Sequence, residues 1–389
     1  MLYDHGKMFD LVSKYRETLD DYMSFFVKYC LPEDGGLRNC VDDDGNIISE
    51  DRYIWHQGRG LWIFSRLYDL LEQKSDWLKA ADNIFGYLCR NGRNKNNRWG
   101  FMVDSNGNIT EDTVNIFSEC FVMSGMGEYF RTTGNKKALD IALDSYEFTS
   151  SVLKNRNDHD FSVLPIRQPD GARLHSINMA FSLAYYDLGK LIGRRDICET
   201  GLALANEVLT DYYDPDKDIV FEYGFDDKRK DTPERRVCNI GHVVECMWFL
   251  LSIYEREGDT KAMDMCCHIL LRHLEIGWDP LYDGLLLAID AEGKKPVFWD
   301  KHDYKGWWVH TEALLSTLFA YKHTGDGQFA NWHRKIYEYA YSKYPLPNGT
   351  WIHWLDRMGN TVSDSGGLPS KDPYHLPRAF MYMIRMIEQ

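Results

Sequence analysis

A helical hairpin recurs along this chain at intervals of roughly sixty residues. Short polar turns separate the two helical patterns of each hairpin, and they occur at Thr133-Gly134-Asn135, Gly193-Arg194-Arg195-Asp196, Glu257-Gly258-Asp259 and Thr324-Gly325-Asp326. A single hairpin cannot bury its apolar face alone, so the repeats must pack against one another. The repeat therefore predicts an architecture built from stacked helical pairs.

Longer loops join each hairpin to the next one. Their turn signals, such as Asn106-Gly107-Asn108 and Met358-Gly359-Asn360, predict short β-hairpins within residues 99–109, 214–223, 283–298 and 348–362. Because long and short connections alternate, a closed ring of helices would place all the long loops at one end. There they can wall a cleft, as functional loops on a rigid scaffold usually do.

The helical patterns divide into two layers. About twelve helices can be counted from their apolar periodicity. Six of them are expected to form the inner layer, and they start near Arg52, Thr113, Ser176, Gly241, Trp308 and Leu376. The sequence therefore predicts an all-α fold, an (α/α)6 barrel with six inner and six outer helices, in which residues 1–389 form a single catalytic domain.

The composition of the chain restricts the binding partners and the cellular environment that can be expected. The formal net charge of −14 argues against a nucleic-acid partner or an anionic membrane surface. No apolar run approaches the roughly eighteen residues that a membrane span needs. The nine cysteines are odd in number and several lie in apolar helical patterns, which is typical of reduced core thiols. Because residues 1–9 lack a secretory pattern, we expect a cytoplasmic protein.

The segment from Asn239 to Leu251 has the pattern of a buried helix that begins with two ionisable residues. His242 and Glu245 lie three residues apart, so both side chains share one face of the first turn. The positive end of a helix dipole should lower the pKa of a histidine there and leave the neutral imidazole that a general base requires. The alternative is a structural pair in which the two side chains only bond each other in the core.

Each predicted inner helix carries polar groups near its loop end, and closing the barrel would bring these groups to one mouth. Besides His242, Glu245 and His375, the residues expected there as substrate contacts are Trp55, Gln57, Trp62, Glu119, Asn178, Trp308, His310, Glu312 and Arg378. The tryptophans could stack on the apolar face of a sugar, or simply pack in the core.

Two histidines and one arginine suggest proton transfer at carbon. His242 and His375, on different helices, could flank a substrate, so that one removes a proton and the other returns it. The enolate oxygen needs fixed positive charge, and Arg59 is the candidate. The alternative for Arg59 is an ion pair with Glu119 or Glu245.

Two other chemistries use the same residues. A glycoside hydrolase would employ Glu245 and Glu312 as acid and base, but it leaves the histidines without a role. A metal could be held by His242, Glu245 and His310. Since no dense ligand motif such as H-E-x-x-H occurs, no metal site is expected.

Several segments together resemble the N-acylglucosamine 2-epimerase family, which includes cellobiose 2-epimerases and aldose–ketose isomerases. The segments are 52–62 (RYIWHQGRGLW), 116–121 (IFSECF), 239–245 (NIGHVVE), 305–313 (KGWWVHTEA) and 375–378 (HLPR). The resemblance implies an (α/α)6 barrel and metal-free epimerisation at C2 of an open-chain sugar through a cis-enediolate. It also implies that His242 and His375 form the acid–base pair, that Arg59 binds the oxyanion and that Glu245 orients its neighbouring histidine.

The resemblance extends to assembly and cofactors. Members are commonly homodimers, and the N-acylglucosamine branch is associated with activation by nucleotides. Because no Walker-type phosphate loop is present, we expect neither an ATP site nor another cofactor. The loop from Ser365 to Tyr374 is expected to cover the substrate.

Within the family, three features favour the N-acylglucosamine branch. These are the segments 116–121 and 375–378, together with Asn178. The expected function is therefore interconversion of N-acyl-D-glucosamine and N-acyl-D-mannosamine. An aldose–ketose isomerase or a cellobiose 2-epimerase is the first alternative. A glycoside hydrolase and a noncatalytic barrel that binds a sugar or a protein are more distant ones.

Overall fold

A computed structural model describes residues 5–111, 116–154, 169, 171–225, 232–362 and 371–389. Most of these residues lie in twelve α-helices. The helices are α1 (His5–Tyr29), α2 (Ile54–Leu70), α3 (Ser75–Asn91), α4 (Ile116–Thr133), α5 (Lys136–Lys154), α6 (His175–Ile192), α7 (Arg195–Glu207), α8 (Ile240–Glu257), α9 (Thr260–Gly277), α10 (Trp307–Thr324), α11 (Gly327–Lys343) and α12 (His375–Glu388). A π-helical turn (Val208–Tyr212) continues α7, and a 3-10 turn (Glu234–Arg236) precedes α8.

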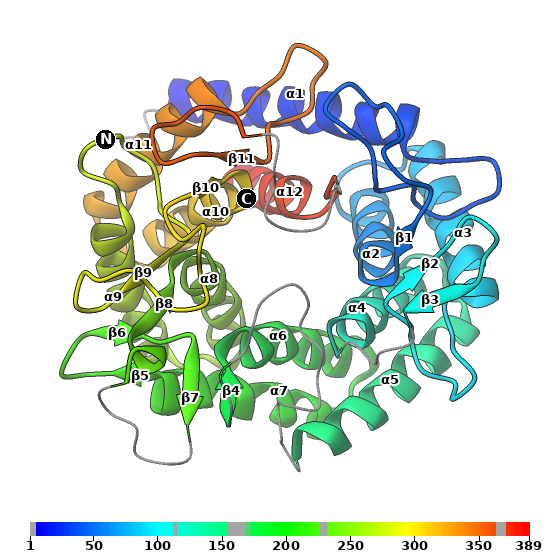
Figure 1. Ribbon diagram of the computed structural model, residues 1–389, viewed down its shortest axis with the longest axis horizontal. Coiled ribbons are helices and arrows are strands. Elements are labelled where there is room, and N and C mark those ends of the chain that lie inside the picture. The colour runs from blue at the N-terminus through cyan, green and yellow to red at the C-terminus, as the bar shows by residue number, and fades with distance from the viewer. Residues whose placement is uncertain (1–4, 112–115, 155–168, 170, 226–231, 363–370) are drawn as a thin grey trace.

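The helices form two concentric rings, which Figure 1 shows from one end of the barrel. The even-numbered helices make the inner ring, in which each packs against the next and α12 returns to α2. The odd-numbered helices lie outside them. This arrangement confirms the predicted (α/α)6 barrel. It arises because the inner helices are apolar on nearly all sides, so that only a surrounding layer removes them from water.

The short turns between paired helices lie where the sequence predicted them. Gly193, Gly258 and Gly325 adopt left-handed conformations, with φ of 72°, 75° and 68°, and they end α6, α8 and α10. Glycine suits these positions because it has no Cβ to clash in that conformation. Each of the first five inner helices therefore turns back directly into an outer helix, and the described parts of the long loops lie at the other end of the barrel.

Short β-strands lie in the long loops. They are β1 (Arg52–Tyr53), β2 (Met102–Val103), β3 (Ile109–Glu111), β4 (Ala172–Leu174), β5 (Tyr213–Asp214), β6 (Ile219–Val220), β7 (Tyr223–Phe225), β8 (Val237–Asn239), β9 (Ala288–Asp290), β10 (Lys305–Gly306) and β11 (Trp354–Leu355). Two antiparallel pairs, β2–β3 and β5–β6, are local hairpins of the predicted kind.

The other strand pairs connect neighbouring loops. The antiparallel pairs β1–β2, β4–β7, β8–β9 and β10–β11 each join the strand before an inner helix to a strand in a later long loop. Local turn signals predicted only hairpins within each loop, so this pairing between loops was missed. Arg52, the predicted start of an inner helix, belongs to β1, and Thr113 lies outside the described residues. These pairs link several neighbouring loops at the mouth of the barrel.

Two further expectations concern the helices and the thiols. Within the described part of the chain, no helix combines the length and apolar character needed to cross a membrane. All nine cysteines lie in described segments and are unpaired, and eight of them are buried. Burial raises the pKa of the Cys30 thiol to about 12, which keeps it protonated. The prediction that these cysteines lie in the core is therefore confirmed for eight of the nine.

Candidate active site

A cavity of about 250 Å³ lies inside the inner ring, and all six inner helices contribute to its wall. The inner helices all begin at the end that carries the long loops, so their first turns meet there. Eight residues singled out from the sequence line this cavity: Trp55, Arg59, Trp62, His242, Glu245, Trp308, His375 and Arg378. The positive ends of six helix dipoles also converge there, which favours negative charge in the cavity.

His242 is held by a carboxylate that the sequence argument missed. Its Nδ1 lies 2.9 Å from Oε2 of Glu222, which sits between β6 and β7 and is 2% exposed. An ionised carboxylate can only accept, so Nδ1–H donates and the tautomer of the ring is fixed, with Nε2 free. Glu245 does not orient this histidine, although both share the first turn of α8. The predicted pairing within the helix is thus replaced by a contact from a loop.

The Glu222 carboxylate also reverses the expected charge preference of His242. Burial alone would lower the pKa of the imidazole, but the adjacent carboxylate raises it above its ordinary value. Burial would likewise raise the pKa of Glu222, yet His242 and His175 lower it to about 2. The helix-dipole argument predicted a lowered pKa for His242, and that direction was wrong because a full charge at hydrogen-bond distance outweighs the partial charge of the dipole.

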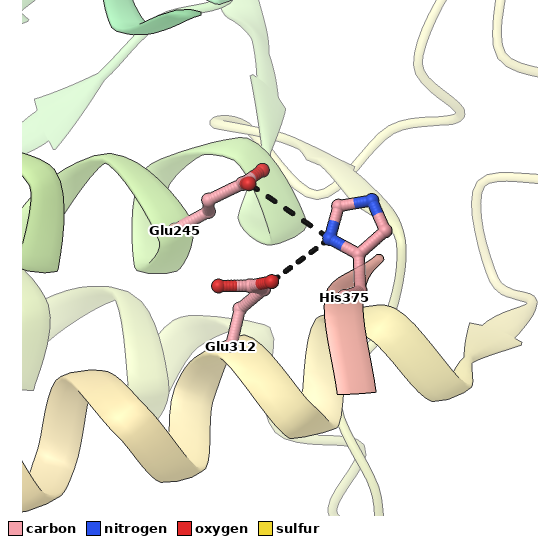
Figure 2. Close-up of side chains that lie close together, drawn as sticks. All are labelled: Glu245, Glu312 and His375. Atoms are coloured by element: carbon pink, nitrogen blue, oxygen red, sulfur yellow. Dashed lines mark hydrogen bonds and ion pairs between the residues drawn. The ribbon is translucent and has the colours of Figure 1, made fainter. Parts of the chain in front are cut away.

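His375, the first residue of α12, has the opposite preference. Burial lowers its pKa to about 3, and the nearby guanidinium groups of Arg59 and Arg378 act in the same direction. Its Nδ1 lies 2.8 Å from Oε1 of Glu312, a fully buried residue of α10. Figure 2 shows this nitrogen turned toward Glu312 and Glu245, and the other ring nitrogen turned away from them. His375 is therefore a neutral imidazole with Nε2 available as a proton acceptor.

Arg378 links the two carboxylates beneath His375. It donates to Glu245 and, over 2.6 Å, to Oε1 of Glu312, while Glu312 also accepts from Nε1 of Trp248 at 2.7 Å. The ligand-capable atoms of Glu245, Glu312 and His375 lie within 4.8 Å of one another, a spacing that could suit a cation. The guanidinium already supplies positive charge to both carboxylates. The two carboxylates are thus engaged by Arg378 and His375, and these contacts hold His375 in place.

Arg59 is positioned by Asp372 rather than by either predicted carboxylate. Its Nη1 donates to Oδ2 of Asp372 over 3.0 Å, and its guanidinium lies 4.1 Å from the ring centroid of Phe121. Oδ2 of Asp372 also lies 3.4 Å from Nε2 of His375. The alternative ion pairs of Arg59 with Glu119 or Glu245 are absent from the described residues. Arg59 thus presents a fixed charge beside the reactive face of His375.

Trp308 lies close to both histidines. Its ring centroid lies 5.8 Å from that of His242 and 5.3 Å from that of His375. The indole is half-buried and lines the cavity. The indole therefore offers a planar apolar surface next to both imidazoles.

Five polar residues expected at the cavity do not line it. One is Glu312, which is bonded to His375, Arg378 and Trp248. The other four bond the loops or the outer layer. Gln57 bonds the backbone of Leu37 through both its oxygen (2.6 Å) and its nitrogen (2.7 Å). Glu119 accepts from the backbone N–H of Trp99 over 3.3 Å, and Nε2 of His310 accepts from that of Leu285 over 2.9 Å. These three side chains satisfy buried backbone groups of the long loops.

Asn178 is the fourth of these residues, and it anchors the outer layer. Its side chain donates to Glu207 (2.8 Å) and to the carbonyl of Leu204 (3.3 Å), and it accepts from the Tyr212 hydroxyl (3.2 Å). All three partners belong to α7 or the turn after it. The polar periodicity of the inner helices therefore marked two kinds of residue, those that face the cavity and those that bond the loops or the outer layer.

Glu222 and Asp372 are the site residues that the sequence argument missed. A signal existed for Glu222, since it is the only acidic or basic residue between Ile219 and Phe225, a segment that is otherwise aliphatic, aromatic or glycine. Asp372 precedes His375 by three residues and falls within the predicted covering loop. Residues 363–370 of that region lie outside the described residues.

The fold and the cavity together define a class of protein, the helical-barrel enzymes that present histidines and carboxylates to a small polar molecule. Residues 35–379 match the family model for N-acylglucosamine 2-epimerase (GlcNAc 2-epimerase). The chain belongs to this family and is a carbohydrate epimerase, an isomerase.

Named relatives fall in two groups. N-acylglucosamine 2-epimerase of Mus musculus is 28% identical over 377 residues, which cover 93% of this chain and 88% of the relative. Cellobiose 2-epimerase of Dictyoglomus turgidum is 25% identical over 354 residues, which cover 85% of this chain and 86% of the relative. The structure of cellobiose 2-epimerase from Bacillus thermoamylovorans aligns with a TM-score of 0.85 at 20% identity, covering 97% of this chain and 99% of that one. This last similarity shows a shared fold.

Proposed function

We propose that this enzyme interconverts N-acyl-D-glucosamine and N-acyl-D-mannosamine by removing the proton at C2 and returning one to the opposite face. The observation that carries this proposal is that two histidines line one cavity, each with Nδ1 held by a different buried carboxylate. Glu222 favours the imidazolium of His242, whereas burial favours the neutral imidazole of His375. One acid and one base are thus ready at the same time.

The chemistry requires an open-chain sugar, because only the C1 aldehyde makes the C2 proton acidic. In one direction Nε2 of His375 takes that proton, and the electron pair moves onto the C1 oxygen to form an enolate, the cis-enediolate in the case of an unmodified sugar. The imidazolium of His242 then donates its Nε2 proton to the other face of C2. The reverse reaction uses the opposite protonation states, and the two histidines re-equilibrate through solvent.

The developing oxyanion needs stabilisation that is in place before the reaction. Arg59 supplies a charge that it cannot lose, fixed by Asp372, and the first turns of the inner helices add their dipoles. Trp55, Trp62 and Trp308 offer aromatic surface for the sugar carbons. Glu245, Glu312 and Arg378 act through His375, whose ring they orient.

The N-acyl specificity is supported by two observations. Mammalian relatives that match nearly the whole chain are named N-acylglucosamine 2-epimerase, as in the mouse protein that matches 93% of this chain. Much of the cavity wall is also apolar, which offers few hydrogen-bond partners to the hydroxyls of a second sugar ring. A disaccharide substrate would leave many of its polar groups unpaired there.

We further propose that residues 1–389 act as a single catalytic domain, in a cytoplasmic homodimer, without metal, nucleotide or other cofactor. The helices from α1 to α12 build one barrel, and the catalytic groups all come from it. The dimer is supported by the family resemblance. Light scattering coupled to size exclusion tests it, because a mass near the 45.5 kDa of one chain would contradict it.

Proton NMR in D2O tests the reaction directly. N-acetylmannosamine, N-acetylglucosamine, mannose and cellobiose are each incubated with the enzyme, and the C2–H and anomeric signals are followed. We expect deuterium at C2 and the epimer to appear with the two N-acetyl sugars. A ketose product from mannose would instead indicate an aldose–ketose isomerase, and exchange confined to cellobiose would indicate a disaccharide epimerase.

The two histidines are tested by His242→Asn and His375→Asn. Each change removes one proton-transfer group, so epimerisation should fall by at least about a hundredfold. Folding is checked by circular dichroism, and sugar binding by calorimetry. Turnover close to that of the unaltered enzyme in either variant would refute the two-histidine mechanism.

A further inference from the structure

The cavity has two unlike walls. Its charged wall comes from the first turns of α8 and α12, with His242, Glu245, His375 and Arg378. The wall formed by α4 and α6 carries the polar residues Ser124, Glu128, Arg131, Ser176 and Asp187, but it also presents the apolar residues Phe121, Met179, Ala180, Leu183, Ala184 and Leu191. On α6 these residues recur every three or four positions, which places them in one stripe along the helix. We name these six residues the apolar groove.

Part of the apolar groove remains uncovered by protein. Phe121, Leu183, Ala184 and Leu191 are only half-buried although their helices belong to the inner ring, and all four face the cavity. Apolar surface held in contact with water is unfavourable, and an apolar ligand group that displaced the water would recover that free energy. The groove therefore fits a hydrocarbon segment better than a further sugar unit.

Paired charges interrupt the groove at Asp187, between Ala184 and Leu191 of α6. Asp187 accepts from Nη1 of Arg256 over 2.6 Å, and Glu128 accepts from Nη1 of Arg66 over 3.1 Å. From Ala180 to Asp187 the helix advances about 10 Å. A chain of several methylene groups can lie along this length before it meets the charged residues.

We propose that the apolar groove binds the acyl chain of the substrate, and that the enzyme accepts N-acyl sugars with chains longer than acetyl. This inference rests on the proposed function, because it places C2 between His242 and His375. The acylamino group is attached to C2 itself, so it must lie next to the reacting atoms. From there the apolar groove is the surface that can receive its carbon chain.

A chain-length series tests the groove. The substrates are N-acetyl-, N-propanoyl-, N-butanoyl- and N-hexanoyl-D-mannosamine, and kcat/KM is measured for each by NMR. We expect kcat/KM to rise by about threefold to fourfold for each of the first added methylenes. This factor corresponds to the free energy of transferring one methylene group from water to an apolar surface. Values that stay level or fall with chain length would overturn the inference.

Substitutions at Ala184, with a control at Ala203, test whether the dependence on chain length arises in the apolar groove. Ala184→Phe fills the groove and should lower the ratio of kcat/KM for the hexanoyl over the acetyl substrate by at least about tenfold. Ala184→Ser adds only a hydroxyl, and it should lower the same ratio by a smaller factor. Ala203→Phe adds the same ring to an exposed position of α7 and should leave the ratio unchanged. Equal ratios in all three variants would overturn the groove assignment.

The series also separates this inference from the proposed function. If N-acetylmannosamine is epimerised but longer chains react more slowly, the apolar groove alone is overturned. If only unacylated sugars exchange at C2, the proposed function fails and the groove assignment fails with it.

Discussion

At the scale of single residues, the charge preference of each histidine depends on which carboxylate bonds its ring and on whether that carboxylate is also paired with an arginine. Glu222 bonds Nδ1 of His242 over 2.9 Å, whereas Nδ1 of its other histidine neighbour, His175, lies 3.9 Å from the same oxygen. Glu312 shares its charge between His375 and Arg378. Burial disfavours the imidazolium of His375, and Arg59 and Arg378 act in the same direction against Asp372 and Glu245, whereas Glu222 favours the imidazolium of His242.

Glu222→Gln tests this division of roles. The amide can still accept from Nδ1 of His242 but carries no charge, so burial would then lower the pKa of the imidazole. His242 is protonated below its pKa, which means that the alkaline limb of the kcat/KM profile should move to lower pH. We also expect kcat/KM near pH 7 to fall by at least about tenfold.

The acid limb should stay in place in that variant, because it reports His375, whose pKa of about 3 does not depend on Glu222. Glu199→Gln, on the exposed surface of α7, is the matched control and should leave both limbs unchanged. An alkaline limb that does not move in Glu222→Gln would show that the carboxylate does not set the charge of His242.

At the scale of elements, the close crossing of α2 and α4 positions Arg59 and Trp55. A Cβ at Gly58 would lie 2.5 Å from the backbone carbon of Phe121, and one at Gly125 would lie 2.5 Å from the carbonyl oxygen of Gly58. The two helices can approach this closely only because both positions lack a side chain. Arg59 follows Gly58 directly, so its reach into the cavity depends on this spacing.

Gly58→Ala should push the two helices apart. We expect the free energy of unfolding to fall by about 1–3 kcal/mol, as for other overpacked cores, together with a loss of kcat/KM from the displaced Arg59. Gly127→Ala on α4 is the control, because its added Cβ would meet only Leu188 and Leu191 at 3.7 and 3.9 Å. Chemical denaturation measures both, and equal stability of the two variants would contradict the argument.

At the scale of the whole molecule, the barrel closes through contact between the two ends of the chain. Phe380 of α12 is fully buried, and its ring centroid lies 4.9 Å from that of Tyr15 on α1 and 5.9 Å from that of Trp351. His375 and Arg378 are carried by the same helix. Closing the ring therefore also completes the candidate active site.

Phe380→Ala should weaken this closure. Removing the buried ring leaves a cavity between the first and last helices, and the free energy of unfolding should fall by about 3–5 kcal/mol. Urea denaturation followed by tryptophan fluorescence measures the loss. Tyr282→Ala, at a residue that is 44% exposed, is the control and should change the stability little. A loss equal to that of the control would show that α12 does not seal the barrel.

The sequence by itself determined the helices, the turns that end them and the alternation of long and short connections. These features depend on neighbours within about four residues, such as the glycines at the ends of α6, α8 and α10, and apolar periodicity reports them directly. It also indicated which turns of which helices meet at the mouth, and most residues named there line the cavity.

Only the tertiary structure decided what each polar side chain contacts. Gln57, Glu119, Asn178 and His310 have the same placement in the sequence pattern as the cavity residues, yet they bond loops or the outer layer. Glu222 reaches His242 from a loop that precedes it by 20 residues, and Asp372 reaches Arg59 across 313 residues. Hydrogen bonds and charge interactions act over a few ångströms in space, so periodicity along the chain cannot specify their partners.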